Sequence, residues 1–321
     1  MTICRRTATL RLLMSAAGLL AVSVLPNPAW SQGFPSKGIE LTLGFGPGSG
    51  IDSNARLLAP YLEKALGVPV TVINQPGGGA VPWANKLART TPDGHTIGMV
   101  GFPLLQNNTV LSKVDYDVAK DFTFLGVLTL DPAVLAVAAN SELKTLDDLI
   151  SAAKAGKRIS IGATGKGSVD YLIALSIQRA SGTKFGIVNF DSTNEGVVAA
   201  LGGSLSAMPM TVSSVAPYIQ SGQLRALAAG TETRAEGLNA PTFKEAGVDL
   251  LAAGSYRAFL APAGLPPAVK EKLAAGIKAA IDDPEFRKKA ADAKLSIVYM
   301  TPDQTGALSG SLVTAARENL N

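Results

Sequence analysis

The feature of this sequence that most restricts its fold is an apolar strand that runs directly into a glycine-rich turn and then a helix. Residues 39–45 are the apolar run, residues 46–50 the turn (the first glycine loop) and residues 51–66 the helix. A second copy follows, in which an apolar run at 68–73 meets a turn at 74–80 (the second glycine loop) and another helix. Strands separated by single helices build parallel βαβ units, so this repeat predicts an α/β fold.

The alternation continues along the chain, with further strands expected at 96–102, 122–130, 133–139, 158–162, 185–190, 205–210, 224–229, 256–261 and 295–300. Further helices are expected at 81–90, 145–155, 168–181, 193–201 and 213–221, and three more begin near Pro266, Asp283 and Thr301. Short runs rich in Val, Ile and Leu fit strands that are covered on both faces. We therefore predict two lobes, each a mostly parallel sheet flanked by helices, with lobe 1 formed by 32–130 and 250–321 and lobe 2 by 131–249.

Residues 1–31 have the features of a cleaved secretory signal peptide. Three arginines precede an apolar run at 12–24 that is too short to span a bilayer, and small residues in 29–31 mark a cleavage site. The adjacent Arg5 and Arg6 leave open whether export uses the general secretory route or the twin-arginine route.

Removal of this segment changes what the composition implies. The single cysteine, Cys4, would leave with the signal peptide, so the mature chain would have no disulfide and no thiol chemistry. The net charge of +4 would fall to +1, because the segment contains three arginines and no acidic residue. A charge this small leaves no electrostatic footprint for nucleic acid, and we expect no nucleic-acid partner.

The glycine-rich stretches do not satisfy the nucleotide-binding motifs. Ile51 stands where a dinucleotide fingerprint needs its last glycine. Ser160 and Gly167 stand where a phosphate P-loop needs a glycine and a magnesium-binding hydroxyl. His95 is the only histidine and sits in a Pro-Asp-Gly-His turn, which gives no second ligand for zinc and no catalytic pair. We therefore expect no cofactor, no metal and no enzyme.

The two glycine loops instead favour an anion cradle. Glycine has no Cβ, so backbone N–H groups can come close to a ligand. A helix that starts directly after such a loop adds unpaired donors and a positive dipole end. Two loops of this kind predict a site for an anion, and among anions they favour a carboxylate.

Four stretches of the sequence carry a family resemblance. They are Gly44-Phe45-Gly46-Pro47-Gly48-Ser49-Gly50-Ile51-Asp52 with Ala55-Arg56, Asn74-Gln75-Pro76-Gly77-Gly78-Gly79, the turn at 88–96, and Ala261-Pro262-Ala263-Gly264-Leu265-Pro266. With these four in this order, the chain resembles the extracytoplasmic solute receptors of the tripartite tricarboxylate transporter system, the Bug receptor family. The resemblance covers essentially all of 34–321.

The resemblance implies a type II periplasmic binding protein of the two-lobed "Venus flytrap" kind. Such a receptor would work as a monomer in the periplasm, bind a small mono-, di- or tricarboxylate, and hand it to a membrane permease pair. An aromatic acid is also compatible with it. A ligand-sensing subunit that signals to a membrane partner remains an alternative. A periplasmic hydrolase or lyase is a further alternative, and it would need a base from among Asp52, Asp170, Asp191 and Glu195.

By the same resemblance, the ligand lies between the loops of the two lobes. The expected contacts in lobe 1 are Phe45, Gly46, Gly48, Ser49, Asp52, Gly78, Gly79, Ala80, Trp83 and Arg257. The expected contacts in lobe 2 are Thr164, Gly167, Ser168, Phe190, Asp191 and Asn194.

Three of these residues have two possible roles. Asp52 either touches the ligand or, as we favour for an anionic ligand, only holds its loop together. Trp83 either stacks on a flat ligand or packs within its lobe. Arg257 either pairs with a distal carboxylate or forms an ion pair within the protein.

Overall fold

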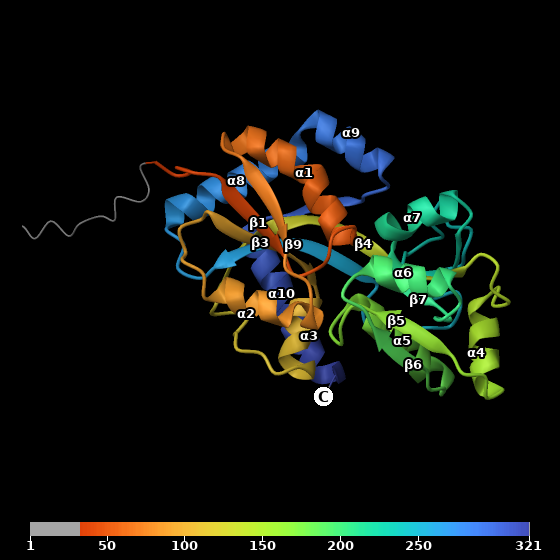
Figure 1. Ribbon diagram of the computed structural model, residues 1–321. Coiled ribbons are helices and arrows are strands. Elements are labelled where there is room, and N and C mark those ends of the chain that lie inside the picture. The colour runs from red at the N-terminus through yellow and green to blue at the C-terminus, as the bar shows by residue number, and fades with distance from the viewer. Residues whose placement is uncertain (1–32, 321) are drawn as a thin grey trace, which may run out of the picture.

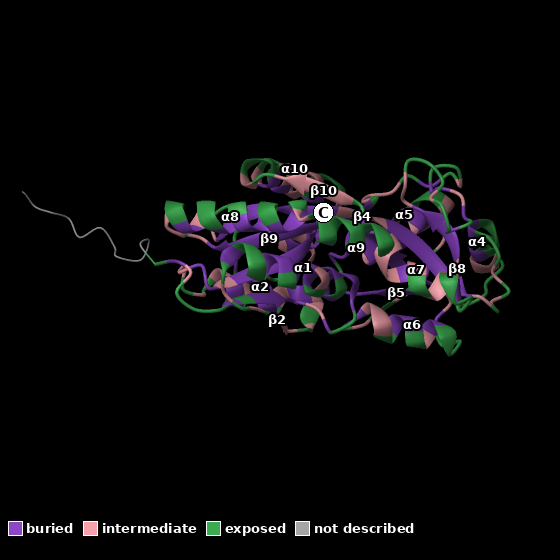
Figure 2. Cartoon of the chain, turned by 90° about the horizontal axis from the view of Figure 1, so that it is seen from above, coloured by how far each residue is buried: buried purple, intermediate pink, exposed green. Residues whose placement is uncertain are grey.

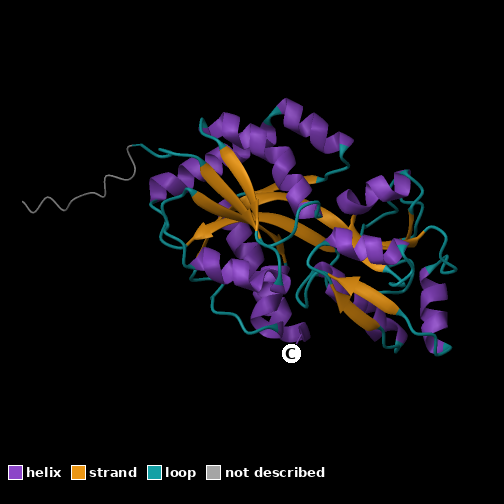
Figure 3. Ribbon diagram, viewed as in Figure 1, coloured by secondary structure: helices purple, strands orange, loops and turns teal. Residues whose placement is uncertain are grey.

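A computed structural model describes residues 33–320, and the predicted signal peptide lies outside the described residues. The described chain folds into two lobes that lie side by side (Figure 1). Figure 3 shows the strands as two groups, each covered by helices. Among residues 33–320, no helix is both long enough and apolar enough to cross a membrane.

The first lobe contains both glycine loops and the C-terminal helices. Its strands are β1 (Ile39–Leu43), β2 (Val70–Asn74), β3 (Thr96–Phe102), β9 (Gly254–Pro262), β10 (Ile297–Met300) and the first part of β4 (Phe122–Ala138). Its helices are α1 (Gly50–Leu66), the short 3₁₀ helix η1 (Gly78–Ala80), α2 (Val81–Ala88), α3 (Leu104–Leu111), α8 (Pro267–Asp282), α9 (Pro284–Asp292) and α10 (Pro302–Leu320).

The second lobe is formed by the middle of the chain. Its strands are β5 (Ser160–Ala163), β6 (Gly186–Asn189), β7 (Met208–Thr211), β8 (Leu224–Ala229) and the second part of β4. Its helices are α4 (Leu146–Lys154), α5 (Val169–Ser181), α6 (Thr193–Leu201) and α7 (Val212–Gln220).

The long strand β4 joins the two lobes. The main sheet has the order β10-β4-β9-β3-β1-β2, and β7 and β8 also pair with β4, on its second-lobe part. The two separate strands predicted at 122–130 and 133–139 are therefore one strand of 17 residues. The predicted lobe boundary at 130/131 falls inside this strand, and the position of that boundary stays a prediction.

The predicted α/β class is confirmed, but the sheet is mixed. Parallel pairing links β1 to β2, β1 to β3 and β5 to β6, as the βαβ pattern predicts. Strands β4 and β9 instead run antiparallel to their neighbours. The expectation of mostly parallel sheets is wrong for these two strands, because β9 returns from the second lobe and enters the first sheet between β3 and β4.

Each lobe has its own apolar core. In the first lobe, helices α1 and α8 cover one face of the sheet through residues such as Leu58, Leu62, Leu273 and Ile277. In the second lobe, α5 packs on β4 and β5 through Ile173 and Ile177. Figure 2 shows β4 and β9 buried along most of their length, while the helices turn exposed residues outward. Two separate cores linked by strands are consistent with lobes that move relative to each other.

Candidate functional site

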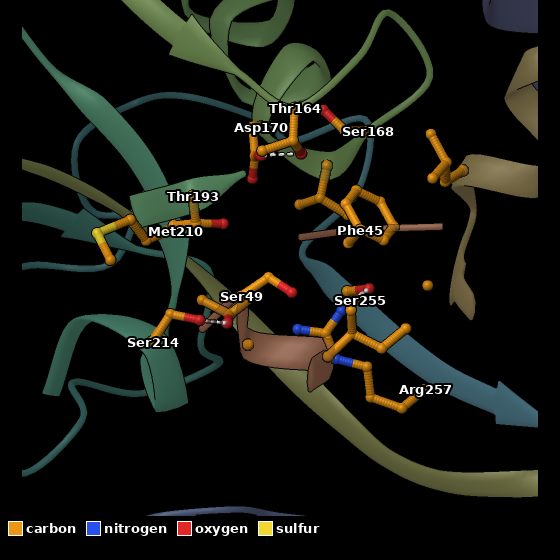
Figure 4. Close-up of a pocket in the computed structure, with 16 residues that line it drawn as sticks. Phe45, Ser49, Thr164, Ser168, Asp170, Thr193, Met210, Ser214, Ser255 and Arg257 are labelled. Carbon is orange, nitrogen blue, oxygen red and sulfur yellow. Dashed lines mark hydrogen bonds between the residues drawn. The ribbon is translucent and has the colours of Figure 1, made fainter. Parts of the chain in front are cut away.

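A small cavity lies between the two lobes, and we call it the inner cavity (Figure 4). Its volume is about 50 Å³. It is lined by Phe45, Ser49, Gly50, Ile51, Gly101, Leu104, Thr164, Ser168, Val169, Asp170, Thr193, Met210, Thr211, Ser214, Ser255 and Arg257. A site of this size has room for a few water molecules or a small polar group, because one water needs roughly 10–15 Å³.

Four helices begin at the wall of the inner cavity. The lining residues include the N-cap or first-turn residues of α1 (Ser49, Gly50, Ile51), α5 (Ser168, Val169, Asp170), α6 (Thr193) and α7 (Thr211, Ser214). The first N–H groups of a helix have no acceptor within the helix, and its macrodipole places positive charge at that end. The inner cavity is therefore an environment that favours an anion, although it holds only one basic side chain.

The start of α1 is held by hydrogen bonds within the first glycine loop. Ser49 is the N-cap residue, and its Oγ donates to the carbonyl of Gly46 at 2.8 Å. The N–H of Gly48 donates to Asp52 Oδ2 at 2.9 Å. Gly48 has a positive φ of 77°, a conformation that glycine adopts without strain. The loop is therefore fixed before any ligand arrives.

Asp52 fastens the first glycine loop to the second. Its carboxylate accepts from Arg56 Nε at 3.0 Å and from Asn74 Nδ2 at 2.9 Å. Burial opposes ionisation of Asp52, but the hydrogen bonds from Arg56, Gly48 and Asn74 hold its pKa below the usual value. The carboxylate is not among the groups that line the inner cavity. This geometry matches the loop-holding role that the sequence favoured.

Arg257 of β9 is the basic group of the inner cavity. Its residue exposure is 7%, its Nη2 donates to Asp131 Oδ2 at 3.3 Å, and its Nη1 donates to Ser255 Oγ at 3.0 Å. The buried Nε has no hydrogen-bond partner. Asp131 also accepts from the N–H and the Oγ of Ser213 at the start of α7. Arg257 thus forms an internal ion pair and still presents its guanidinium to the inner cavity.

Asp170 of α5 is the acidic group of the inner cavity. Its Oδ2 accepts from Thr164 Oγ1 at 2.6 Å, and its residue exposure is 8%. Burial raises the pKa of Asp170 to about 6, although the Thr164 hydrogen bond and the positive charge of Arg257 oppose that shift. In Figure 4, Asp170 and Arg257 lie on opposite walls of the inner cavity.

The second glycine loop lines a different space, which we call the outer cleft. The outer cleft is lined by Gly78, Gly79, Asn108, Leu111, Ser112, Lys113, Thr164, Gly165, Lys166, Asn189, Phe190, Asp191 and Glu195. Its volume is about 560 Å³, and Thr164 belongs to both spaces. The sequence predicted that the two glycine loops form one cradle, whereas the structure places only the first at the inner cavity. The turn of the second glycine loop directs Gly79 toward Gly165 of the other lobe. Both glycines line the outer cleft, so the second loop lies there.

The predicted site residues divide into groups by location. The inner cavity receives Phe45, Ser49, Thr164, Ser168 and Arg257. The outer cleft receives Gly78, Gly79, Phe190 and Asp191 in addition to Thr164.

Four other predicted residues lie where the lobes touch. A Cβ on Gly46 would lie 3.2 Å from Ser192 Cβ, and one on Gly48 would lie 2.2 Å from Asn194 Nδ2. The carbonyl of Gly167 accepts from Asn107 Nδ2 at 2.9 Å. Absence of a side chain at these glycines therefore allows the lobes to close on each other.

Ala80 and Trp83 are buried in the core of the first lobe. Their exposures are 3% each, and they belong to the same apolar cluster. Trp83 Nε1 donates to Thr42 Oγ1 at 3.0 Å, and the ring packs against Gly44 and Gly98. This geometry favours the packing role of Trp83, because its ring is enclosed by its own lobe and does not line the inner cavity. Stacking on a ligand stays a prediction.

Sequence reasoning missed part of the inner cavity. It did not select Gly50, Ile51, Gly101, Leu104, Val169, Asp170, Thr193, Met210, Thr211, Ser214 and Ser255 as ligand contacts. The ends of the expected strands at 96–102 and 205–210 were an available signal, because ligands in α/β sheets bind beyond the carboxyl ends of strands. Among residues 33–320, no group of three or more His, Cys, Asp or Glu is placed to hold a metal ion.

Comparisons with known proteins agree with the fold and with the family resemblance. The model of the tripartite tricarboxylate transporter family receptor matches residues 54–316. A Cupriavidus necator protein, named the UPF0065 protein in the gbd 5' region, is 30% identical over 301 residues, which cover 93% of this chain and 91% of that protein. Protein BugT of Bordetella pertussis is 28% identical over 309 residues, which cover 95% of this chain and 93% of BugT.

A solved structure, named as that of a periplasmic transporter, matches with a TM-score of 0.83 at 28% identity, covering 89% of this chain and 97% of that chain. These matches confirm the resemblance drawn from the four sequence stretches and the periplasmic-binding-protein fold. Members of the family are periplasmic solute receptors and not enzymes. Because the family model covers most of its length, this chain belongs to the tripartite tricarboxylate transporter receptor family.

Proposed function

We propose that this receptor captures a small carboxylate, with a carboxylate group of the ligand bound in the inner cavity, and delivers it to a membrane permease of the tripartite tricarboxylate transporter type. The observation that most supports a carboxylate as the ligand is that four helix N-termini meet around Gly50 and Ser214. Arg257 supports it, because a buried guanidinium with an unpartnered Nε lines the same space. A carboxylate would accept hydrogen bonds from both kinds of donor.

The energetic scale of these groups is sufficient for specific binding. Each helix start contributes about 0.3–1 kcal/mol when exposed and up to about 2 kcal/mol when partly buried. A hydrogen bond to a charged group contributes about 1.5–3 kcal/mol. After ordering and desolvation costs are subtracted, a few such contacts reach the roughly −8 kcal/mol of a micromolar dissociation constant.

The proposed capture couples binding to closure of the lobes. The first lobe provides Ser49 and Arg257 to the inner cavity, and the second lobe provides Ser168 and Thr193. A ligand that contacts all four binds the closed arrangement more tightly than an open one. It therefore shifts the population of the receptor toward closure.

The capture step is tested by comparing acids with their uncharged amides. Thermal unfolding of the mature protein is measured with mono-, di- and tricarboxylates and with the matching amides. A ligand that binds only the folded state raises the melting temperature by mass action. We expect at least one acid to raise it and its amide to leave it unchanged. If amides stabilise as well as acids, the inner cavity is not a carboxylate site.

The delivery step needs a separate measurement. A labelled form of the stabilising acid is supplied to cells that produce a tripartite tricarboxylate permease pair with or without this receptor. We expect uptake at low acid concentration only when the receptor is present. Uptake that does not depend on the receptor, with binding confirmed in vitro, would point to a sensing role instead.

A further inference from the structure

Asp170 is unexpected in a cavity that otherwise favours anions. Of the 16 residues that line the inner cavity, only Asp170 and Arg257 carry charge. Acids in the first turn of a helix are stabilised there by the helix macrodipole and need no burial for this. Asp170 is instead buried and lines the cavity.

The carboxylate of Asp170 is held in place and cannot turn away from a ligand freely. Thr164 Oγ1 donates to its Oδ2, and Thr164 itself lines the same cavity. Arg257 lies on the opposite wall, so the two charged groups face the same space from different lobes (Figure 4). The inner cavity therefore has one wall that attracts a carboxylate and one that repels it.

A simple carboxylate would lose affinity at such a site. Its negative charge would lie close to Asp170 in a space with little water, where like charges repel strongly. A ligand that carries a hydrogen-bond donor next to its carboxylate has no such conflict. Its carboxylate can bind Arg257 and the start of α1 at Gly50, while its donor binds Asp170.

We propose that Asp170 is a specificity-determining residue that selects carboxylates with an adjacent hydrogen-bond donor, either an ammonium or a hydroxyl group. This inference rests on the proposed carboxylate-binding function and narrows its ligand class to amino and hydroxy acids. An ammonium group would form the stronger contact, because it also neutralises the charge of Asp170.

The test uses matched acids that differ only in the donor. Binding constants are measured by calorimetry for propionate, lactate and alanine, and for succinate, malate and aspartate. We expect wild-type protein to bind a donor-bearing acid at least about ten-fold more tightly than the plain acid of the same series. In Asp170→Asn, we expect that ratio to fall to about three-fold or less, with affinity for the plain acid unchanged or improved.

Control variants separate selectivity from folding. Asp147→Asn changes an exposed first-turn acid of α4 in the same lobe, and it should leave every affinity unchanged. Thr164→Val keeps the charge of Asp170 but removes the hydrogen bond that orients it. If Asp170→Asn does not fold, Thr164→Val provides the test, because it should reduce the same ratio while the protein keeps its native circular dichroism.

Two results would overturn the inference while leaving the carboxylate function in place. Equal wild-type affinity for plain and donor-bearing acids would remove the selectivity. An unchanged ratio in Asp170→Asn would remove Asp170 as its source. Failure of every acid to bind the wild-type protein would instead overturn the carboxylate function, and the inference with it.

Discussion

Asn74 Nδ2 donates to Asp52 Oδ1 at 2.9 Å, and this bond links the end of β2 to the first turn of α1. The same Nδ2 also donates to the carbonyl of Phe45 at 2.9 Å. Phe45 lines the inner cavity, so Asp52 and Asn74 together fix the residue next to the ligand space without touching it. The hydrogen-bonded pair of Asp52 and Asn74 thus fixes the position of Phe45 without lining the inner cavity itself.

Asp52→Asn should destabilise the protein at neutral pH. The amide cannot accept on both atoms, so the donors of Gly48, Arg56 and Asn74 are no longer all satisfied. We expect a loss of about 1–3 kcal/mol in the free energy of unfolding, measured by urea denaturation. The pKa of Asp52 is lowered in the folded state, so the difference should shrink as pH falls below its usual value. Equal stability of variant and wild type at neutral pH would contradict this role.

Gly50→Ala should weaken ligand binding without weakening the first lobe. A methyl group at Gly50 would lie 2.3 Å from Ser214 Oγ, which belongs to the other lobe. The start of α1 would then be held away from α7, so the closed arrangement becomes less favourable. We expect a several-fold loss of affinity in calorimetry and a larger radius of gyration with ligand present in small-angle X-ray scattering.

A second substitution provides the control for steric contact. Ser214→Gly removes the Oγ that the new methyl group would meet, so the double variant Gly50→Ala/Ser214→Gly should regain part of the lost affinity. The double variant is compared with Ser214→Gly, and Gly50→Ala is compared with wild type. If both comparisons give the same loss of affinity, the loss comes from the loop itself and not from the lobe contact.

Much of the fold followed from local patterns, and the exceptions have physical reasons. Helix α1 begins at Gly50 and ends at Leu66, close to its expected range, because a capping serine and an αL glycine mark its ends. Helix α3 was not expected, since its buried face includes Gln106, Asn107 and Asn108 and so lacks an amphipathic pattern. Those side chains bond to distant parts of the chain, which no local pattern encodes.

The site was predicted only where a motif lies next to a strand end. Ser49 and Ser168 were identified through the family resemblance, and the structure places each at the N-cap of a helix. In the sequence, the charged Asp131 interrupts the apolar run and suggests that the strand ends there. In the structure it lies within β4, because Arg257, 126 residues away, neutralises its charge. Asp170 resembles an ordinary helix-capping acid until the fold places it opposite Arg257. Long-range pairings of this kind are decided by topology and not by local sequence.

Trp83→Phe should lower stability and leave affinity unchanged. The variant loses the hydrogen bond from Nε1 to Thr42 and part of the ring that packs against Gly44 and Gly98. We expect a cost of about 1–3 kcal/mol in urea denaturation. Calorimetry with the best-binding acid should give the wild-type dissociation constant. A clear loss of affinity in folded protein would restore Trp83 as a ligand contact.

Arg257→Met should reduce both affinity and stability. The ligand would lose a charge-assisted hydrogen bond, which corresponds to about a ten- to hundred-fold weaker binding constant. Asp131, which is 1% exposed, would lose its positive partner, and breaking a buried pair in this way costs about 3–5 kcal/mol. Calorimetry and urea denaturation measure the two effects separately.

The double variant Asp131→Asn/Arg257→Met separates these two roles. Removing the charge of Asp131 removes the unpaired buried carboxylate, so stability should return toward wild type. Affinity should stay low, because the guanidinium is still absent. If stability and ligand affinity both return to wild-type values, Arg257 acts only as a structural partner of Asp131.

Asp170→Asn should stabilise the ligand-free protein by an amount that depends on pH. Burial raises the pKa of Asp170 to about 6 in the folded state, from an ordinary value of 3.8. Between these two values the unfolded chain has released the proton that the folded protein still holds, so the wild type loses stability as pH rises, by a few kcal/mol in all. Asparagine does not titrate, so the free energy of unfolding of the variant, measured by urea denaturation, should rise relative to that of wild type from pH 4 to pH 7. Asp148→Asn should show the opposite trend, because backbone hydrogen bonds from Lys144 and Thr145 and the Thr145 side-chain bond lower the pKa of Asp148. A stability difference for Asp170→Asn that does not change with pH would show that the buried carboxylate has an ordinary pKa.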